Sequence, residues 1–118
     1  MQSPWMIDDD RGSRLDAIIA SSEDAIIGKT LDGVVTDWNR GAEEMFGYSA
    51  TEMVGQSITT LMLPGQEGEE GIILENVRRG EFIDHLETRR RRKDGTVIDV
   101  SLTVSPVYTP DGRIVGAV

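Results

Sequence analysis

The feature that most constrains the fold is the motif X-Asp-Gly, which occurs three times, at residues 31–33, 93–95 and 110–112. Each copy stands between segments rich in β-branched and aromatic residues, which are typical of strands. Asp tolerates the bridge region and Gly adopts positive φ, so each motif predicts a three-residue hairpin loop, a type I turn closed by glycine. Because tight hairpins join antiparallel neighbours, the sequence predicts an antiparallel sheet.

The middle hairpin also has a predicted register. A three-residue loop pairs Leu86 with Leu102 on an apolar face and Arg89 with Asp99 on the opposite face. A two-residue loop would place Glu87 against Leu102 and mix the two faces. The three-residue register is therefore the prediction.

The segment between the first two hairpins has helical spacing. Asn39 and Ser49 are N-cap candidates, Ser49 with Glu52 forms a capping box, and Gly47 is a stop. A further short helix is predicted near Ile58, and a longer one over residues 69–79. The start of the longer helix overlaps an acidic stretch at 65–71 that we expect to be flexible. These helices are the elements available to cover the apolar face of the sheet.

The start of the chain is predicted as an arm over residues 1–12 and an amphipathic helix after it. Leu15, Ile18 and Ile19 form an apolar stripe on this helix, with the spacing i, i+3, i+4. Such a stripe must pack against another surface, either of its own domain or of a partner, and we take these three residues as dimer-interface candidates.

Composition narrows the function classes. The chain has 21 acidic and 12 basic residues, a formal net charge of −9, no cysteine and one histidine. Without cysteine there are no disulfides, cysteinyl photoadducts or thiolate metal sites. A strongly negative chain is a poor partner for nucleic acid or an anionic membrane, and no apolar run has the length of a membrane helix. No phosphate loop, nucleophile–histidine motif or metal-ligand spacing occurs, so neither catalytic residues nor a metal site are predicted.

Two charged clusters are interpreted as solvated surface, and for the basic one a contact with an acidic face of a partner stays open. The basic run 89–93 lies at a hairpin tip, where alternate residues point to opposite faces. The acidic residues Glu67, Glu69 and Glu70 lack the spacing of a calcium loop.

Several motifs together resemble a bacterial PAS domain. They are residues 22–27 (SEDAII), 32–39 (DGVVTDWN), 42–48 (AEEMFGY), 52–56 (EMVGQ), 91–96 (RRKDGT) and 110–116 (PDGRIVG). The resemblance runs from about Arg14 to Val118. It implies an α+β PAS fold over residues 13–118, with a five-stranded antiparallel sheet of order 2-1-5-4-3 and short helices over one face. The family pattern continues beyond Val118, so we expect a chain cut within its last strand.

The resemblance also implies a role. PAS domains are sensory, signal-transduction and dimerisation modules of larger proteins, such as two-component histidine kinases or cyclic-nucleotide enzymes. We therefore expect a cytoplasmic, non-enzymatic module that forms a homodimer and acts on an effector domain of its parent protein.

The ligand is less constrained. Haem-binding relatives use a histidine on the long helix, whereas here the single histidine, His85, falls in the next strand, facing away from Leu86. Haem is therefore not expected, nor is any tightly bound cofactor, while non-covalent flavin or a small metabolite stays open as the alternative function. Trp38 and Asn39 are interpreted as structural. The expected pocket wall consists of Phe46, Ile58, Leu61, Met62, Ile73, Leu74, Val77, Leu86, Val100 and Leu102.

Overall fold

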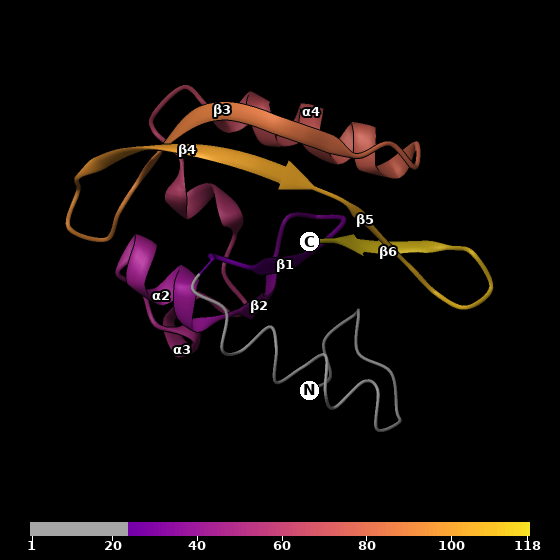
Figure 1. The fold of residues 1–118 in the computed structure, drawn as a ribbon, viewed down its shortest axis with the longest axis horizontal. Coiled ribbons are helices and arrows are strands. Elements are labelled where there is room, and N and C mark those ends of the chain that lie inside the picture. The colour runs from indigo at the N-terminus through magenta and orange to yellow at the C-terminus, as the bar shows by residue number, and fades with distance from the viewer. Residues whose placement is uncertain (1–23) are drawn as a thin grey trace.

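The computed structural model describes residues 24–118, which form antiparallel strands and a group of helices (Figure 1). The elements are β1 (Ile27–Thr30), β2 (Val35–Trp38), α2 (Arg40–Phe46), α3 (Ala50–Met53), the 3-10 helix η1 (Ile58–Leu61), α4 (Glu67–Arg78), β3 (Ile83–Arg91), β4 (Val97–Val104), β5 (Pro106–Tyr108) and β6 (Ile114–Ala117).

The three X-Asp-Gly loops share one geometry, and this prediction is confirmed. In each loop the glycine has positive φ, and the backbone N–H before the loop donates to the carbonyl after it. The closing bonds run from Thr30 to Val34, from Arg92 to Thr96 and from Thr109 to Arg113, at 2.9, 2.8 and 2.8 Å. The predicted register of the middle hairpin is also confirmed, since Leu86 pairs with Leu102 and Arg89 with Asp99.

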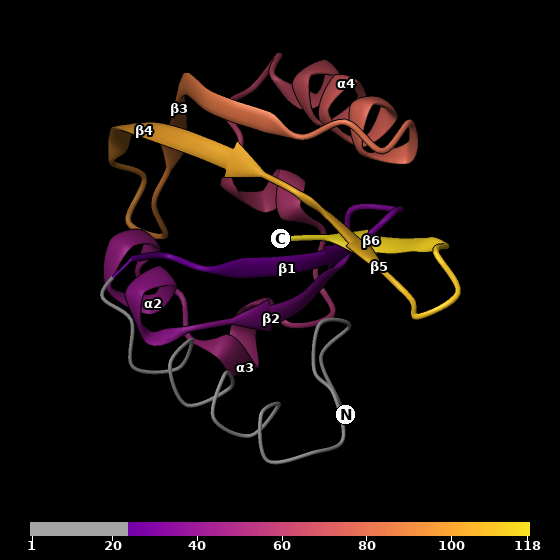
Figure 2. The same ribbon diagram turned by 45° about the vertical axis from the view of Figure 1, so that its right-hand side comes forward.

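The strands divide into two sheets. One has the order β2-β1-β6-β5, and β3 and β4 form a separate two-stranded sheet. The single sheet of order 2-1-5-4-3 is therefore not confirmed. The chain passes from one sheet to the other at Ser105, whose backbone exchanges hydrogen bonds of 2.8 and 3.0 Å with Val118. The C-terminal end thus lies between β4 and β1 (Figure 2).

The helices begin and end largely where the sequence predicts. Asn39 Oδ1 accepts from the Ala42 N–H at 2.9 Å to begin α2, and Gly47 ends it with a φ of +83°. The capping box of Ser49 and Glu52 begins α3. The prediction of a flexible stretch at 65–71 is wrong from Glu67 onward, because α4 begins there. Its acidic first turn lies at the positive end of the helix dipole, which stabilises a helix there.

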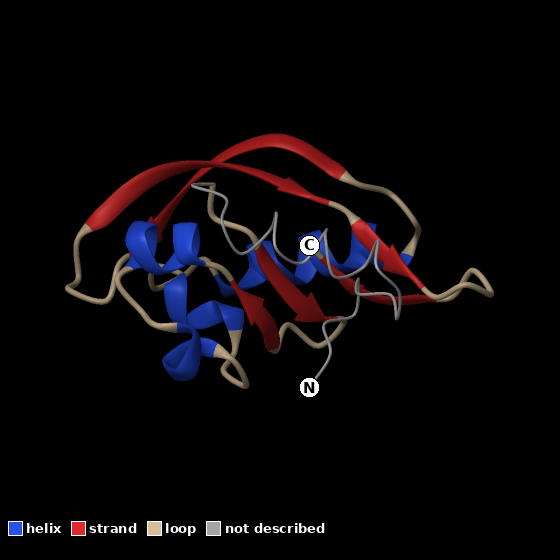
Figure 3. Ribbon diagram, turned by 60° about the horizontal axis from the view of Figure 1, so that its bottom comes forward, coloured by secondary structure: helices blue, strands red, loops and turns tan. Residues whose placement is uncertain are grey.

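The core forms where these helices pack against the strands, and Figure 3 shows the helices gathered beneath the curved β3–β4 hairpin. Trp38 is buried against Phe46, with ring centroids 5.7 Å apart, and its Nε1–H donates to the Tyr48 carbonyl at 2.8 Å. The structural interpretation of Trp38 is confirmed. A second group joins α4 to the sheets through Val77, Val104 and their neighbours.

The predicted arm and the amphipathic helix with Leu15, Ile18 and Ile19 lie outside the described residues. Over residues 24–118, none of the helices has the length and apolar character that crossing a bilayer requires.

Candidate functional site

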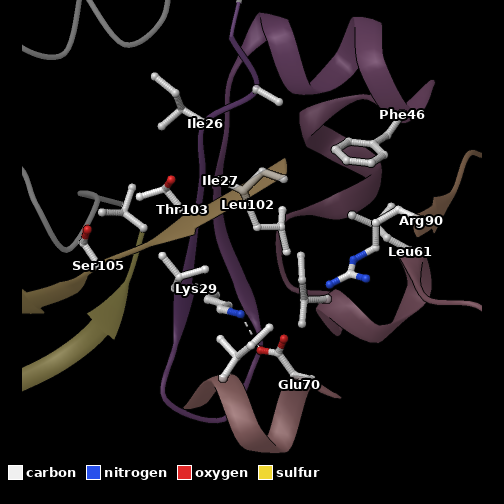
Figure 4. Close-up of a pocket in the computed structure, with 15 residues that line it drawn as sticks. Ile26, Ile27, Lys29, Phe46, Leu61, Glu70, Arg90, Leu102, Thr103 and Ser105 are labelled. Atoms are coloured by element: carbon white, nitrogen blue, oxygen red, sulfur yellow. Dashed lines mark hydrogen bonds and ion pairs between the residues drawn. The ribbon is translucent and has the colours of Figure 1, made fainter. Parts of the chain in front are cut away.

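A cavity of about 320 Å³ lies between α4, β1 and the β3–β4 hairpin (Figure 4). Its wall is mostly apolar, with a few charged and hydroxyl side chains. The lining residues are Ala25, Ile26, Ile27, Lys29, Phe46, Ile58, Leu61, Glu70, Ile73, Arg90, Leu102, Thr103, Val104, Ser105 and Val118. An apolar wall with a small number of polar groups is typical of a small-molecule site.

The predicted pocket wall falls into two groups. The residues that line the cavity are Phe46, Ile58, Leu61, Ile73 and Leu102. Those outside its lining are Met62, Leu74, Val77, Leu86 and Val100. Val77 shows the reason, because it lies on the part of α4 that packs against Val104 and Ala117, in the core beside the cavity.

Sequence reasoning missed a buried ion pair in this wall. Lys29 Nζ and Glu70 Oε1 are 2.5 Å apart, and their side chains are only 9% and 7% exposed. Lys29 follows Ile27 by two residues in β1, so both side chains point into the cavity. Glu70 precedes Ile73 and Val77 at helical spacing, which puts it on the buried stripe of α4. These two periodicities are the signal that could have found the pair.

A second ion pair lies beside the first. Arg90 Nη2 is 2.7 Å from Glu69 Oε1, and its Nη1 donates to Thr88 Oγ1 and to the Arg89 carbonyl. Arg90 is buried, because strand alternation turns it inward from the basic run. The interpretation of the basic run 89–93 as solvated is therefore wrong at Arg90. The interpretation of the acidic cluster as solvated is wrong at Glu69 and Glu70, because both form ion pairs in the cavity wall or beside it.

Burial shifts the pKa of Lys29. Loss of hydration lowers its pKa below the ordinary value of 10.5, while the charge and hydrogen bond of Glu70 oppose this shift and the charge of Arg90 adds to it. Within residues 24–118, Glu70 Oε1 is the one hydrogen-bond acceptor of Lys29 Nζ. A lysine ammonium has three donors, so two remain for whatever occupies the cavity.

His85 lies away from this site. It is 80% exposed, 3.3 Å from Asp84, and occupies a bulge of β3 with a φ of +52°. The described residues hold no cluster of three or more metal-ligating side chains. Neither histidine nor any sulfur ligand occurs among the cavity-lining residues described above.

Comparisons with known proteins agree on one family. The family model described as PAS fold matches residues 13–118. No functionally curated protein matches the sequence significantly. A crystal structure of a PAS domain from Colwellia psychrerythraea is similar, with 29% identity, 92% coverage of each chain and a TM-score of 0.82.

Two further structures share the fold. A domain of a sensory box sensor histidine kinase/response regulator from Geobacter sulfurreducens has 21% identity, 91% coverage of each chain and a TM-score of 0.73. An RNA-binding light-oxygen-voltage receptor has 22% identity and a TM-score of 0.79, and the alignment covers 89% of this chain and 30% of the receptor.

Proposed function

Since the chain belongs to the PAS family, a family of sensory domains, we propose that it senses a small molecule held in the cavity between α4 and the two sheets. The observation that carries this proposal is the lining itself, which joins an apolar wall to a buried, charged Lys29 and Glu70. In small-molecule sites, a few polar groups in an otherwise apolar wall fix the orientation of the ligand.

The position of α4 supplies a route for the response. Two consecutive glutamates in its first turn hold different sheets: Glu70 contacts Lys29 of β1, and Glu69 contacts Arg90 of β3. A ligand that bonds to Lys29 would alter one of these connections and leave the other in place. Occupancy of the cavity would then shift α4 and β3 relative to β1.

The cofactors of the alternative function fit this lining less well. Haem needs an axial ligand, and the lining described here has none, with His85 on the outer surface. A flavin ring presents an amide edge, whereas the lining between Ala25 and Val118 has no amide side chain and its charged groups pair with one another. We therefore favour a metabolite, and expect purified protein to show no absorbance above the aromatic band.

The remaining parts of the proposal concern the parent protein. We place the domain in the cytoplasm, as a homodimer joined through Leu15, Ile18 and Ile19, within a larger signalling protein. The similar Geobacter structure is a domain of a sensor histidine kinase/response regulator, which supports this setting. Sedimentation should show a dimer, and replacement of the three apolar residues by serine should give a monomer.

The experiment on the cavity uses native mass spectrometry and thermal shifts with a set of metabolites. Ala25, which lines the cavity, is changed to Phe to fill it, and Ser101→Phe adds the same bulk at an exposed position. Ligand binding should disappear in Ala25→Phe and persist in Ser101→Phe. Equal binding by both variants, or no binding by the unmodified protein, would contradict a sensing role for the cavity.

A further inference from the structure

We propose that the ligand is a small organic acid, and that its single carboxylate binds at Lys29 with an apolar body against Phe46 and Leu61. This inference rests on the proposed function, because it names the chemical class that the same cavity takes. It is carried by the charges that face the cavity, the donors they leave open, and the volume and polarity of the remaining wall.

The cavity wall carries charged side chains of both signs. Lys29, Arg90 and Glu70 line it, which gives two cations and one anion. Glu69, the partner of Arg90, is not part of the lining and its side chain is 26% exposed. Lys29 and Arg90 are each compensated by one carboxylate, so the wall accepts a ligand with one negative charge through the donors that these two cations leave open. A second negative charge would lie in the same space as Glu70.

Open donors give the carboxylate its position. Lys29 Nζ uses one of its three donors on Glu70, and within the described part of the chain the Arg90 Nε–H has no acceptor. Figure 4 shows the ammonium of Lys29 and the guanidinium of Arg90 pointing toward the space that Glu70 faces. A carboxylate accepts several hydrogen bonds at once, and bonds between charged groups are stronger than neutral ones.

The remaining wall limits the size and polarity of the ligand. A volume of about 320 Å³ equals that of roughly ten waters, which suits a body of about ten non-hydrogen atoms. The wall formed by Phe46, Ile58, Leu61 and Ile73 is apolar, and the hydroxyl side chains of the lining belong to Thr103 and Ser105. The ligand class is therefore a monocarboxylate with an aromatic or short aliphatic body.

The test compares phenylacetate with its neutral analogue phenylacetamide by isothermal titration calorimetry. The variant is the double substitution Lys29→Met and Glu70→Leu, which removes both charges of the pair and leaves neither partner alone. Lys93→Met is the matched control, because Lys93 forms a 2.5 Å ion pair with Glu52 outside the cavity. Circular dichroism and cooperative unfolding establish that each variant is folded.

We expect the unmodified protein and Lys93→Met to bind phenylacetate at least about tenfold more tightly than phenylacetamide, because one charge-assisted contact has an effect of this size. In the double variant this ratio should fall to about threefold or less. Equal affinity for acid and amide in the unmodified protein would overturn the inference while the proposed function stood. If neither probe binds, the inference is also overturned. The comparison of Ala25→Phe with Ser101→Phe decides separately whether the cavity binds other compounds.

Discussion

At the scale of single residues, Lys29 and Glu70 lose most of their hydration and compensate one another. Removing one partner of a buried pair leaves an unpaired charge, which costs more than the pair contributes. We therefore expect Lys29→Met alone to lower the free energy of unfolding by about 3–5 kcal/mol. The double substitution Lys29→Met and Glu70→Leu should recover most of this loss, as measured by urea unfolding. Additive losses would contradict the pairing.

The same residues show how much of the site the sequence could predict. Phe46, Ile58 and Leu61 were found, because apolar residues at helical spacing are usually buried. Glu70 and Arg90 were missed, because each belongs to a run of like charges and such runs are usually solvated. Only the periodicity of each element separates the inward charge from its exposed neighbours.

At the scale of elements, the loop of the β3–β4 hairpin depends on Asp94. Its carboxylate accepts a hydrogen bond from the Thr96 hydroxyl at 2.5 Å and a second one from the Thr96 N–H. These bonds, the hydroxyl's first, hold the pKa of Asp94 below its ordinary value of 3.8. A carboxyl whose pKa is lowered by folding stabilises the fold above its unfolded pKa, and the effect is lost as the pH falls through the folded pKa.

Thr96→Val removes the hydroxyl donor and keeps the backbone donor. The difference in free energy of unfolding between the unmodified protein and Thr96→Val should be constant above about pH 5 and shrink below about pH 4. Thermal unfolding as a function of pH measures it, and NMR titration should show the pKa of Asp94 returning toward 3.8. A difference that persists unchanged to pH 2 would exclude this contribution.

The contact of β1 with β6 depends on a glycine. The pairing is short, with Lys29 opposite Ala117 and Thr30 opposite Gly116, and a Cβ on Gly116 would lie 2.5 Å from the Lys29 carbonyl oxygen. We expect Gly116→Ala to destabilise the domain by about 1–3 kcal/mol, since it must push two backbones apart.

Gly68 is the matched control for this change. It lies in α4, and a Cβ there would meet no atom within 4 Å. Gly68→Ala should therefore raise stability by about 0.5–1 kcal/mol through the better helix propensity of alanine. Both variants are compared by denaturant unfolding, and equal effects would show that the close approach of β6 to β1 is unimportant.

Elements set by local chemistry were predictable, and those set by distant contacts were not. The cap at Asn39 and the Asp-Gly loops depend on residues a few positions apart. The break at Ser105 depends on its pairing with Val118, thirteen positions further on, and the bulge at His85 lies where the pairing of β3 with β4 shifts register between Ile83 and Leu86. No local pattern records either contact.

At the scale of the whole molecule, α4 joins two sheets that do not pair with one another. The sequence could predict the antiparallel strands and their helical cover, because hairpin loops and apolar periodicity determine them. It could not predict that adjacent glutamates of α4 would each hold a different sheet. This arrangement makes the cavity the point at which a bound molecule can act on both.

Backbone NMR during titration with phenylacetate tests this account most directly. We predict the largest chemical-shift changes at Lys29, Glu69, Glu70 and Arg90 and along α4, with little change at the loop of residues 93–95. Changes confined to the outer face of the β3–β4 hairpin, around the shallow hollow between Glu87 and Ser101, would contradict it.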